Sequence, residues 1–233
     1  MADRPQDAAA ARESARSDHK QTGRLEAFSD GVFAIAITLL VLDFKVPKPA
    51  DLPAGPGLFG AHGLLAALLT QWPTLLAYLT SFLSILVMWV NHHLLFGLIR
   101  RTDHLFLYLN GLLLLFVTFV PFPTALVAAY LEHPGATAAA ALYTATYLCI
   151  AIVYNLLWRH ASRDRRLLDS AASATAIEEI DRSYRFGPLL YATALVLAFV
   201  NLTASLVTCL ALAVFFSVTG SRSRRQRPGG AGG

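Results

Sequence analysis

Long apolar stretches alternate with short polar segments along most of this chain. A membrane-spanning helix needs about 20 mostly apolar residues, and six stretches approach or reach that length. They cover residues 25–44, 73–99, 105–130, 136–158, 184–200 and 202–219. The last two are short and closely joined near Asn201, so they could instead form one long broken segment. The pattern predicts an all-α integral membrane protein with six transmembrane helices per chain.

The segments outside these stretches are polar. Residues 1–23 and 221–233 have the composition of disordered tails. Residues 160–183 are charged and alanine-rich, which predicts a cytoplasmic helix packed beneath the bundle. Pro121 and Pro123 are expected to kink or end the third apolar stretch. Residues 24–220 are thus expected to form a single transmembrane domain between two tails.

Composition narrows the class of protein further. Hydrophobic residues make up 55% of the chain and charged residues 15%, against about 25% charged residues in an ordinary soluble domain. Cys149 and Cys209 lie in apolar runs without a CxxC pattern, which argues against a disulfide framework or a zinc site. No basic patch with interleaved aromatic residues is present, so a nucleic-acid partner is not expected. Nothing in the sequence calls for a cofactor.

The distribution of positive charge predicts the topology. All but two of the 19 lysines and arginines lie in the two tails and in the segments after the second and fourth apolar stretches. Six spans with both termini in the cytoplasm place all of these on the cytoplasmic side, as the positive-inside bias requires. The two exceptions, Lys45 and Lys48, follow the first stretch. Arginines after the fourth stretch are expected to contact anionic membrane lipids.

A carboxylate lies inside the first apolar stretch, RLEAFSDGVFAIAITLLVLDF, which begins at Arg24. Asp30 is about 9 Å deeper than Arg24 at 1.5 Å per residue. An ionised group at that depth is costly unless it is paired, and it marks a candidate functional site. Glu26 lies four residues earlier on the same helix face and would repel Asp30 if both were charged. Asp30 therefore needs a partner from another span.

The second stretch offers that partner at a matching depth. Its sequence MWVNHHLLF contributes Trp89, Asn91, His92 and His93. We predict a polar network in which these donors satisfy Asp30, with Ser29 as a further member and Arg24 at the cytoplasmic rim. The network could serve only to lock helix packing, or it could act directly in gating or conduction. A metal site formed by Asp30 and the two histidines is the weaker alternative, because adjacent histidines point to different helix faces.

An apolar stripe follows Asp30 on the first stretch. Ile35, Leu39 and Leu42 recur at helical spacing, Thr38 lies beside them, and Phe28 precedes them on the same stripe. From periodicity alone, a stripe that faces lipid or the core is the favoured interpretation.

The string from Arg24 to Asp43 resembles the signature of the family of transmembrane protein 175, the endosomal and lysosomal potassium channel, in its bacterial form. That signature is an arginine, three residues, Phe-Ser-Asp, and then Ala-Ile and Thr-Leu-Leu. The matching residues are Arg24, Phe28, Ser29, Asp30, Ala34, Ile35, Thr38, Leu39 and Leu40. WVNHHLLF resembles a second recurring stretch of the family, so the resemblance is close over residues 24–100.

The resemblance implies a potassium-permeable channel that lacks the carbonyl filter of ordinary potassium channels. One six-span repeat per chain implies a homotetramer in a bacterial cell membrane, with potassium ions and lipids as partners. In this family the first helices line the pore, so Ile35 would form the narrowest layer and Leu39 and Leu42 would lie further outward. Thr38 would add a ring of hydroxyl groups. On this resemblance the pore interpretation of the stripe becomes the favoured one.

Other functions remain open at this point. A proton-coupled secondary transporter could use Asp30 with His92 or His93 as a relay, although no inverted repeat or glycine-broken helix is found. An intramembrane enzyme would need a nucleophile or metal deep in a span, and no enzyme is expected. Asp43 and Asp51 could concentrate cations at the extracellular side, although ordinary solvation of loop carboxylates is the simpler interpretation.

Overall fold

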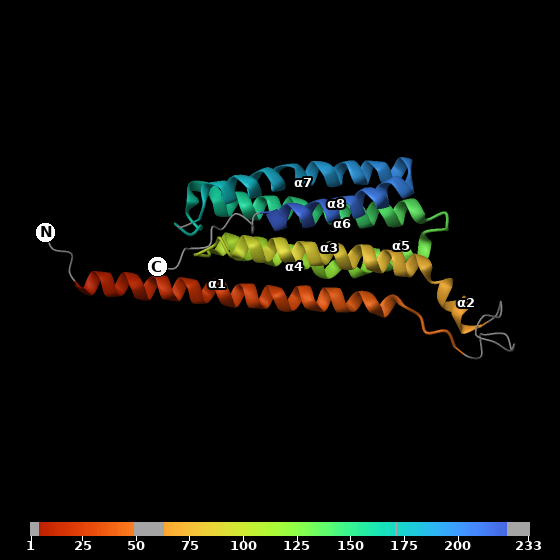
Figure 1. Ribbon diagram of the computed structural model, residues 1–233, viewed down its shortest axis with the longest axis horizontal. Helices are drawn as coiled ribbons and strands as arrows, with labels where there is room; N and C mark the ends of the chain where they lie inside the picture. The colour runs from red at the N-terminus through yellow and green to blue at the C-terminus, as the bar shows by residue number, and fades with distance from the viewer. Residues whose placement is uncertain (1–4, 49–62, 171, 223–233) are drawn as a thin grey trace, which may run out of the picture.

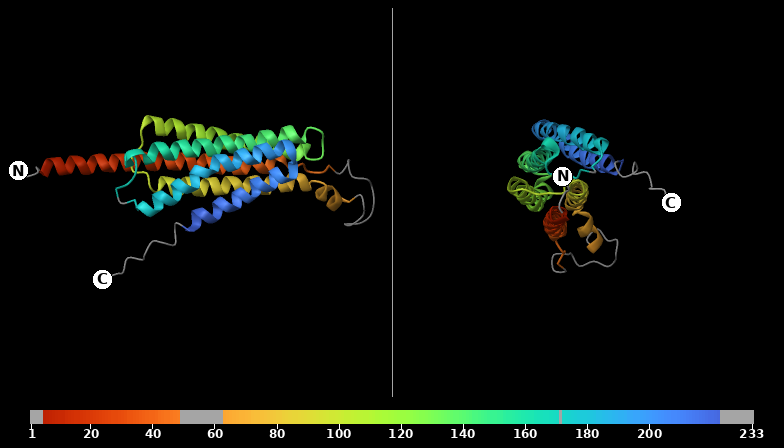
Figure 2. Two further views of the ribbon diagram at one scale, coloured as in Figure 1. Left: turned by 90° about the horizontal axis from the view of Figure 1, so that it is seen from above. Right: turned by 90° about the vertical axis from the view of Figure 1, so that its left-hand side faces the viewer.

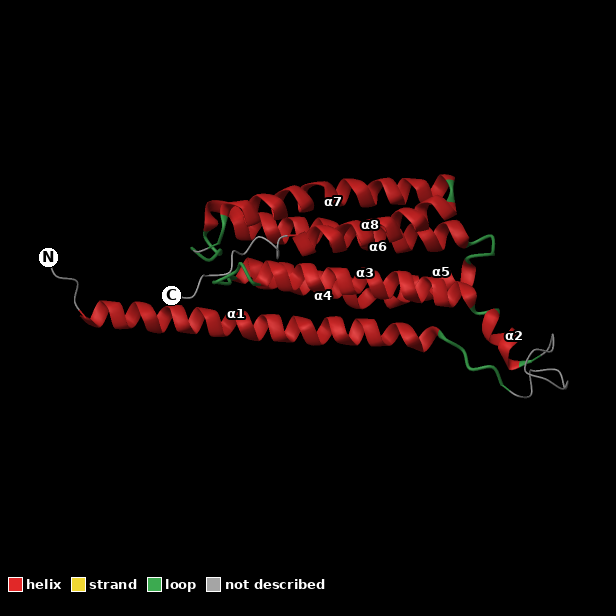
Figure 3. Cartoon of the chain, viewed as in Figure 1, coloured by secondary structure: helices red, strands yellow, loops and turns green. Residues whose placement is uncertain are grey.

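Helices form the regular structure of this protein (Figures 1 and 3). The computed structural model describes residues 5–48, 63–170 and 172–222, so Asp51 lies outside the described residues. The α-helices are α1 (Pro5–Leu39), α2 (Leu64–Leu69), α3 (Trp72–Phe96), α4 (His104–Phe119), α5 (Pro121–Tyr130), α6 (Ala136–Ser162), α7 (Ala174–Val200) and α8 (Leu202–Arg222). The described ranges also contain the short 3-10 helices η1 (Leu40–Asp43) and η3 (Arg163–Arg165). The described ranges contain no strand, which confirms the all-α prediction for them.

The long helices lie side by side along one axis in three layers (Figures 1 and 2). α1 forms one outer layer, α3 to α5 form the middle layer, and α6 to α8 form the other outer layer. α1 packs against α3 and α4, while α4 and α5 pack against α6. α7 packs against α6 and α8, and α8 also contacts α3. α1 begins and α8 ends at the same end of the bundle (Figure 1).

Within the described residues, five helical segments are long and apolar enough to cross a membrane. They are Arg16–Asp43, Trp72–Phe96, His104–Tyr130, Ala136–Arg165 and Ile180–Val200. Each overlaps one of the first five predicted spans. The sixth predicted span falls on α8, where the apolar helical stretch Leu202–Phe216 is shorter. The structure is therefore that of a multi-pass membrane protein with five candidate spans.

The third candidate span is interrupted at its prolines. α4 ends at Phe119 and α5 begins at Pro121, with the Val120 amide bonded to the Val117 carbonyl at 3.2 Å. Proline is tolerated in the first turn of a helix because the N–H that it lacks would have no partner there. Pro121 and Pro123 both occupy that first turn, so the chain restarts a helix instead of leaving the bundle.

The N-terminal segment differs from the predicted disordered tail. Residues 5–23 belong to α1, which runs without interruption into the membrane. Charge suggested disorder, but the segment is rich in alanine, which has the highest helix propensity. Pro5 occupies the first helical position, and no further proline or glycine occurs before Gly23. In this segment the helix propensity of alanine outweighs the charge that predicted disorder.

The predicted separate helix over residues 160–183 is not present in the structure. α6 continues to Ser162. Just beyond it, Asp164 and Arg165 adopt positive φ angles of 55° and 53°, which are incompatible with a continued helix. Arg100 N then donates to Leu167 O at 2.9 Å, and Asp169 N donates to Leu98 O at 2.9 Å. These bonds to the loop between α3 and α4 replace helical bonds in the linker. The second half of the segment is the start of α7.

α7 continues through Pro188, although the predicted span began only at residue 184. A proline inside a helix cannot donate to the carbonyl four residues earlier, which here belongs to Tyr184. The side-chain amide of Asn155 on α6 donates to that carbonyl at 2.8 Å. A neighbouring helix therefore satisfies the group that Pro188 leaves free, and this allows α7 to remain continuous.

Candidate functional site on the first helix

α1 and the short helix η1 that continues it have two faces with different surroundings. The face toward the bundle includes Phe33, Ala36 and Leu40, each at most 1% exposed. The opposite face carries large apolar side chains in the open: Phe28 is 64% exposed, Ile35 57% and Leu42 72%. All five predicted stripe residues lie on this exposed face: Phe28, Ile35, Thr38, Leu39 and Leu42. The single chain therefore leaves an apolar helix face uncovered.

Two side chains one turn apart on α3 hold carboxylates of α1. Trp89 Nε1 donates to Asp30 Oδ1 at 2.9 Å. His93 Nδ1 lies 2.9 Å from Glu26 Oε1, and the Trp89 and His93 rings stack with their centroids 6.1 Å apart. Glu26 was considered only as a source of repulsion in the sequence. Its contact with His93 makes it part of the junction between the two helices.

A second, fully buried chain of polar groups crosses three helices. Asn110 Nδ2 on α4 donates to Ser29 Oγ at 3.0 Å, and Ser29 Oγ donates to Leu25 O at 2.9 Å. Asn110 Oδ1 lies 3.0 Å from His92 Nε2. Because this amide oxygen can only accept, His92 must carry its proton on Nε2. These hydrogen bonds fix α1, α3 and α4 relative to one another and also set the tautomer of His92.

Sequence reasoning did not find Asn110. A carboxamide is a rare residue in a run such as LFLYLNGLLLLF, and its isolation was the available signal. Its partner His92 is 0% exposed and lies between Phe33 and Phe96, with ring centroids at 5.3 and 4.3 Å. The imidazole therefore fills an apolar slot and makes its hydrogen bond at one edge.

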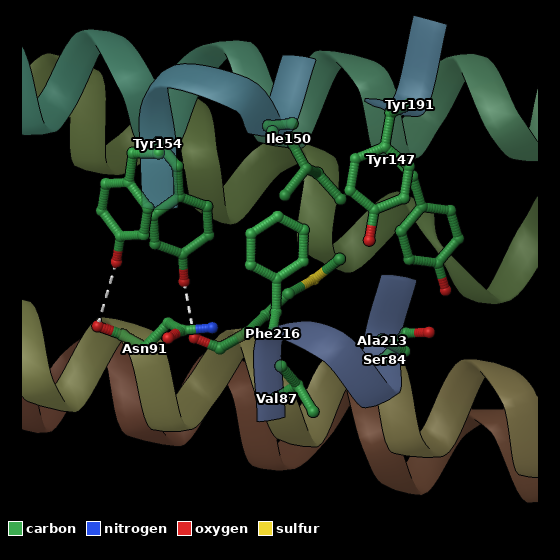
Figure 4. A pocket seen from close by; sticks show the side chains of 13 residues that line it. Ser84, Val87, Asn91, Tyr147, Ile150, Tyr154, Tyr191, Ala213 and Phe216 are labelled. Carbon is green, nitrogen blue, oxygen red and sulfur yellow. Dashed lines mark hydrogen bonds between the residues drawn. The ribbon is translucent and has the colours of Figure 1, made fainter. Parts of the chain in front are cut away.

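Asn91 was predicted to join this network, but the structure places it elsewhere. It lines a cavity of about 60 Å³ among α3, α6, α7 and α8 (Figure 4). Its backbone carbonyl accepts from the Tyr184 hydroxyl at 3.4 Å. Successive residues of a helix are about 100° apart, so Asn91 and His92 face different neighbours.

Two further charged residues stand apart from the network. Arg24 is exposed, and within the described ranges no hydrogen bond or ion pair joins it to Asp30 or the histidines. Asp43 ends η1 at the other end of the span, and in the described part of the chain its buried Oδ2 has no hydrogen-bond partner. The described residues also contain no group of three or more side chains able to hold a metal ion. His92 and His93 instead have separate partners on α4 and α1.

The C-terminal end of the first candidate span has an anchor that the sequence did not reveal. Gln71 accepts from Lys45 N at 2.9 Å through Oε1 and donates to Lys45 O at 2.8 Å through Nε2. Phe44 packs edge-on against Tyr78 of α3, with ring centroids 5.4 Å apart. The chain that follows α1 is thus attached to the start of α3.

The N-terminal half of α1 is also anchored. The Thr22 hydroxyl is directed at Arg100 O at 3.2 Å, and Thr22 is only 5% exposed. Asp18 Oδ2 accepts from Arg101 Nε at 2.9 Å. α1 is therefore attached to the loop between α3 and α4 before it enters the apolar part of the bundle.

Asp103 organises the same loop. It caps α4 by accepting from Phe106 N at 2.8 Å, and it also binds His160 at 2.9 Å and Arg166 at 3.0 Å. Partial burial acts to raise the pKa of Asp103, but the hydrogen bonds from Phe106 and His160 and the nearby positive charge outweigh it. The pKa of this carboxyl therefore lies below its ordinary value.

The apolar helices form a bundle in which hydrogen bonds hold α1 by one face only. This arrangement is that of a multi-pass membrane protein. The profile of the family described as endosomal/lysosomal potassium channel TMEM175 matches residues 24–121. A protein named potassium channel from Chamaesiphon minutus is 53% identical over 201 residues, which are 86% of this chain and 96% of that protein. Another protein named potassium channel, from Streptomyces collinus, is 44% identical and covers 84% of this chain and 91% of its own length.

A solved structure gives the same result. The crystal structure of a lysosomal potassium-selective channel TMEM175 homolog from Chamaesiphon minutus aligns with a TM-score of 0.75 and 52% identity. The alignment covers 86% of this chain and 98% of that one. This chain belongs to the TMEM175 family, which is a family of ion channels and not of enzymes.

Proposed function

We propose that this protein is a potassium-selective cation channel that conducts passively between its first helices. One observation carries the proposal: α1 exposes the apolar side chains Phe28, Ile35 and Leu42 on one face while polar bonds hold its other face. Two relatives that match almost over their full length are named potassium channels. The polar bonds would then fix the direction in which the exposed face points.

Four copies would bring the exposed faces together around an axis. In such a homotetramer Ile35 forms the narrowest layer, and Leu39 and Leu42 lie further outward. Rings of branched apolar side chains exclude water and close a pore by dewetting. A small displacement of α1 would admit a partly dehydrated ion, and potassium gives up its water more readily than sodium.

Thr38 supplies the polar group in this apolar layer. Its hydroxyl donates to Ile35 O at 2.9 Å. Because the hydrogen is directed at the backbone, the lone pairs of the oxygen are left for a cation. Since Ile35 and Thr38 lie within α1, the proposed path uses hydroxyl oxygens and apolar surface instead of a ring of backbone carbonyls.

The proposed topology has six spans, with α8 as the sixth and both termini in the cytoplasm of a bacterial cell. The basic loops after α3 and α6 hydrogen-bond to each other at one end of the bundle, which agrees with the positive-inside bias. The channel needs no cofactor, potassium is the permeant ion, and the arginines between α6 and α7 contact anionic lipids.

Ion flux in proteoliposomes tests the proposal. With no pH gradient imposed, potassium flux should exceed sodium flux and should need no proton counter-movement. Flux that occurs only with a proton gradient would instead support the transporter, with Asp30 and His92 or His93 as its relay. The structure gives that alternative less support, because Asp30 and His92 are bonded to Trp89 and Asn110.

Ile35→Asn tests the constriction itself. A polar side chain at the narrowest layer should keep it hydrated and raise the cation leak several-fold. Ile152→Asn is the matched control, because Ile152 is also exposed, at 41%, but belongs to α6 on the far side of the bundle. Equal or lower flux in an assembled Ile35→Asn tetramer would remove Ile35 from the gate.

A further inference from the structure

The N-terminal part of α1 extends beyond the end of the bundle formed by the other helices (Figure 1). α1 is one helix from Pro5 to Leu39, whereas the family match begins only at residue 24. The extension therefore precedes the part of the chain that matches the family, and the proposed constriction gives it no role.

The same side of α1 faces the bundle inside and outside the apolar region. Thr22, which is directed at Arg100 O, lies seven residues before Ser29 and 11 before Phe33. At about 100° per residue, these spacings place Ser29 and Phe33 each within about 20° of Thr22 around the helix. Asp18, which binds Arg101, lies on the same half of the helix. The helix does not change which side it presents along this length.

The opposite side is therefore continuous as well. Ser17 is 18 residues before Ile35, which is about five full turns, so the two point in the same direction. Arg24, Gln21 and Glu13 fall within about 40° of that direction. All four of these polar residues are exposed. The apolar face that carries Ile35 and Leu42 thus continues toward the N-terminus as a polar face.

We infer that the conduction path continues beyond the membrane into a cytoplasmic vestibule, lined by this polar face from four copies of the chain with Ser17 closest to the axis. The inference rests on the proposed function, because the direction of Ile35 defines the axis. Arg24 contributes positive charge at the membrane end of the vestibule, and Glu13 contributes negative charge about 16 Å further out at 1.5 Å per residue. Charges at these positions set the local potassium concentration.

A charge placed at position 17 tests the vestibule. In about 10 mM KCl, Ser17→Lys should lower the initial potassium flux into proteoliposomes by about threefold, and Ser17→Glu should raise it. Both effects should shrink in about 0.5 M KCl, where the screening length falls to a few ångströms. Gln21→Lys provides a second position on the same face and should also lower the flux.

His19 is the matched control position. It is exposed like Ser17, but two residues turn it about 200° around the helix, to the bundle side. His19→Lys and His19→Glu should leave the flux within about 20% of the wild type, because the charges lie away from the axis and in open solvent. Tetramer content, measured by size, should be the same for all variants.

The outcomes separate this inference from the proposed function. Equal changes in potassium flux for variants at positions 17 and 19, or no change at either position, would overturn the vestibule. Potassium flux through the wild type would in that case still support the proposed channel function. Absence of potassium flux in the assembled wild type would overturn the proposed function and the vestibule together. Opposite effects of Ser17→Lys and Ser17→Glu that disappear in high salt would support both.

Discussion

The two sides of the bundle are held together by different chemistry. Where α1 meets α3 and α4, the contacts include charged and amide side chains such as Asp30, Glu26 and Asn110. Where α6, α7 and α8 meet, aromatic rings predominate: Tyr147 stacks on Tyr191 with centroids 5.9 Å apart, and Tyr191 stacks on Phe216 at 6.4 Å.

The difference reflects what each interface has to specify. Apolar packing alone tolerates small rotations of a helix, since neighbouring side chains can repack at low cost. The directional hydrogen bonds of Asp30, Glu26 and Asn110 allow α1 only one rotation about its axis, because any other rotation would leave polar groups unpaired. α1 needs such a constraint if its exposed face is to point at an axis. α6, α7 and α8 have no comparable requirement.

Removing a polar contact of α1 should have the largest effect. Asp30→Ala takes the acceptor from the partly buried Trp89 Nε1 and should cost about 1–2 kcal/mol, toward the lower end of the range for a donor left unpaired. The tetramer fraction in detergent should fall, while the ratio of potassium to sodium flux in the remaining tetramers should not change. Thermal unfolding and size analysis provide these measurements.

Asp30→Asn is the matched variant, because it keeps an acceptor oxygen and should lose less stability than Asp30→Ala. Normal assembly of Asp30→Ala with loss only of proton-coupled flux would contradict the structural role of Asp30. It would favour the transporter in its place.

Asn155 is a polar exception within the aromatic side of the bundle. Asn155→Leu should leave the Tyr184 carbonyl without its donor and lower stability by about 1–2 kcal/mol. The same substitution in a Pro188→Ala background should cost less, because residue 188 then supplies its own N–H to that carbonyl. Equal losses in both backgrounds, measured by thermal unfolding, would show that Asn155 acts in some other way.

Asp103, in the loop between α3 and α4, connects the two sides of the bundle through His160 and Arg166. At neutral pH its substitution should have the smallest effect on stability of those considered. Its folded-state pKa lies below the ordinary value of 3.8. Its stabilising contribution is therefore complete above that value and is lost as the pH falls through the folded pKa. The thermal midpoint should therefore decline as the pH falls below about 4, and Asp103→Asn should flatten that decline. An unchanged slope would show that other carboxyl groups control acid stability.

The positions of the apolar helices could be predicted because hydrophobic runs of sufficient length have few alternatives in a membrane. The prediction lost accuracy where a remote residue decides the local structure. The fifth span was predicted to begin at residue 184, ten residues after the start of α7, and only the position of Asn155 on another helix shows how α7 continues through Pro188. The extension of α1 was missed for a local reason, since its alanine content was outweighed by its charge.

The candidate site was predictable to the same extent. Matching depths in two antiparallel spans brought Asp30 and Trp89 together in the argument, and they are bonded in the structure. Depth does not specify rotation, however, so Asn91 was placed in the network although it faces the opposite neighbours. Asn110 and Gln71 have no pattern around them in the sequence, and their roles follow only from tertiary packing.

The anchor formed by Gln71 has an evolutionary consequence. Gln71 binds the main chain of residue 45 through both an N–H and a carbonyl, and it does not use the lysine side chain. Every amino acid except proline offers the same two groups. Substitution at position 45 should therefore be tolerated freely, whereas position 71 should accept few replacements. In related channels we expect the residue at position 45 to vary while the Gln71 carboxamide is retained.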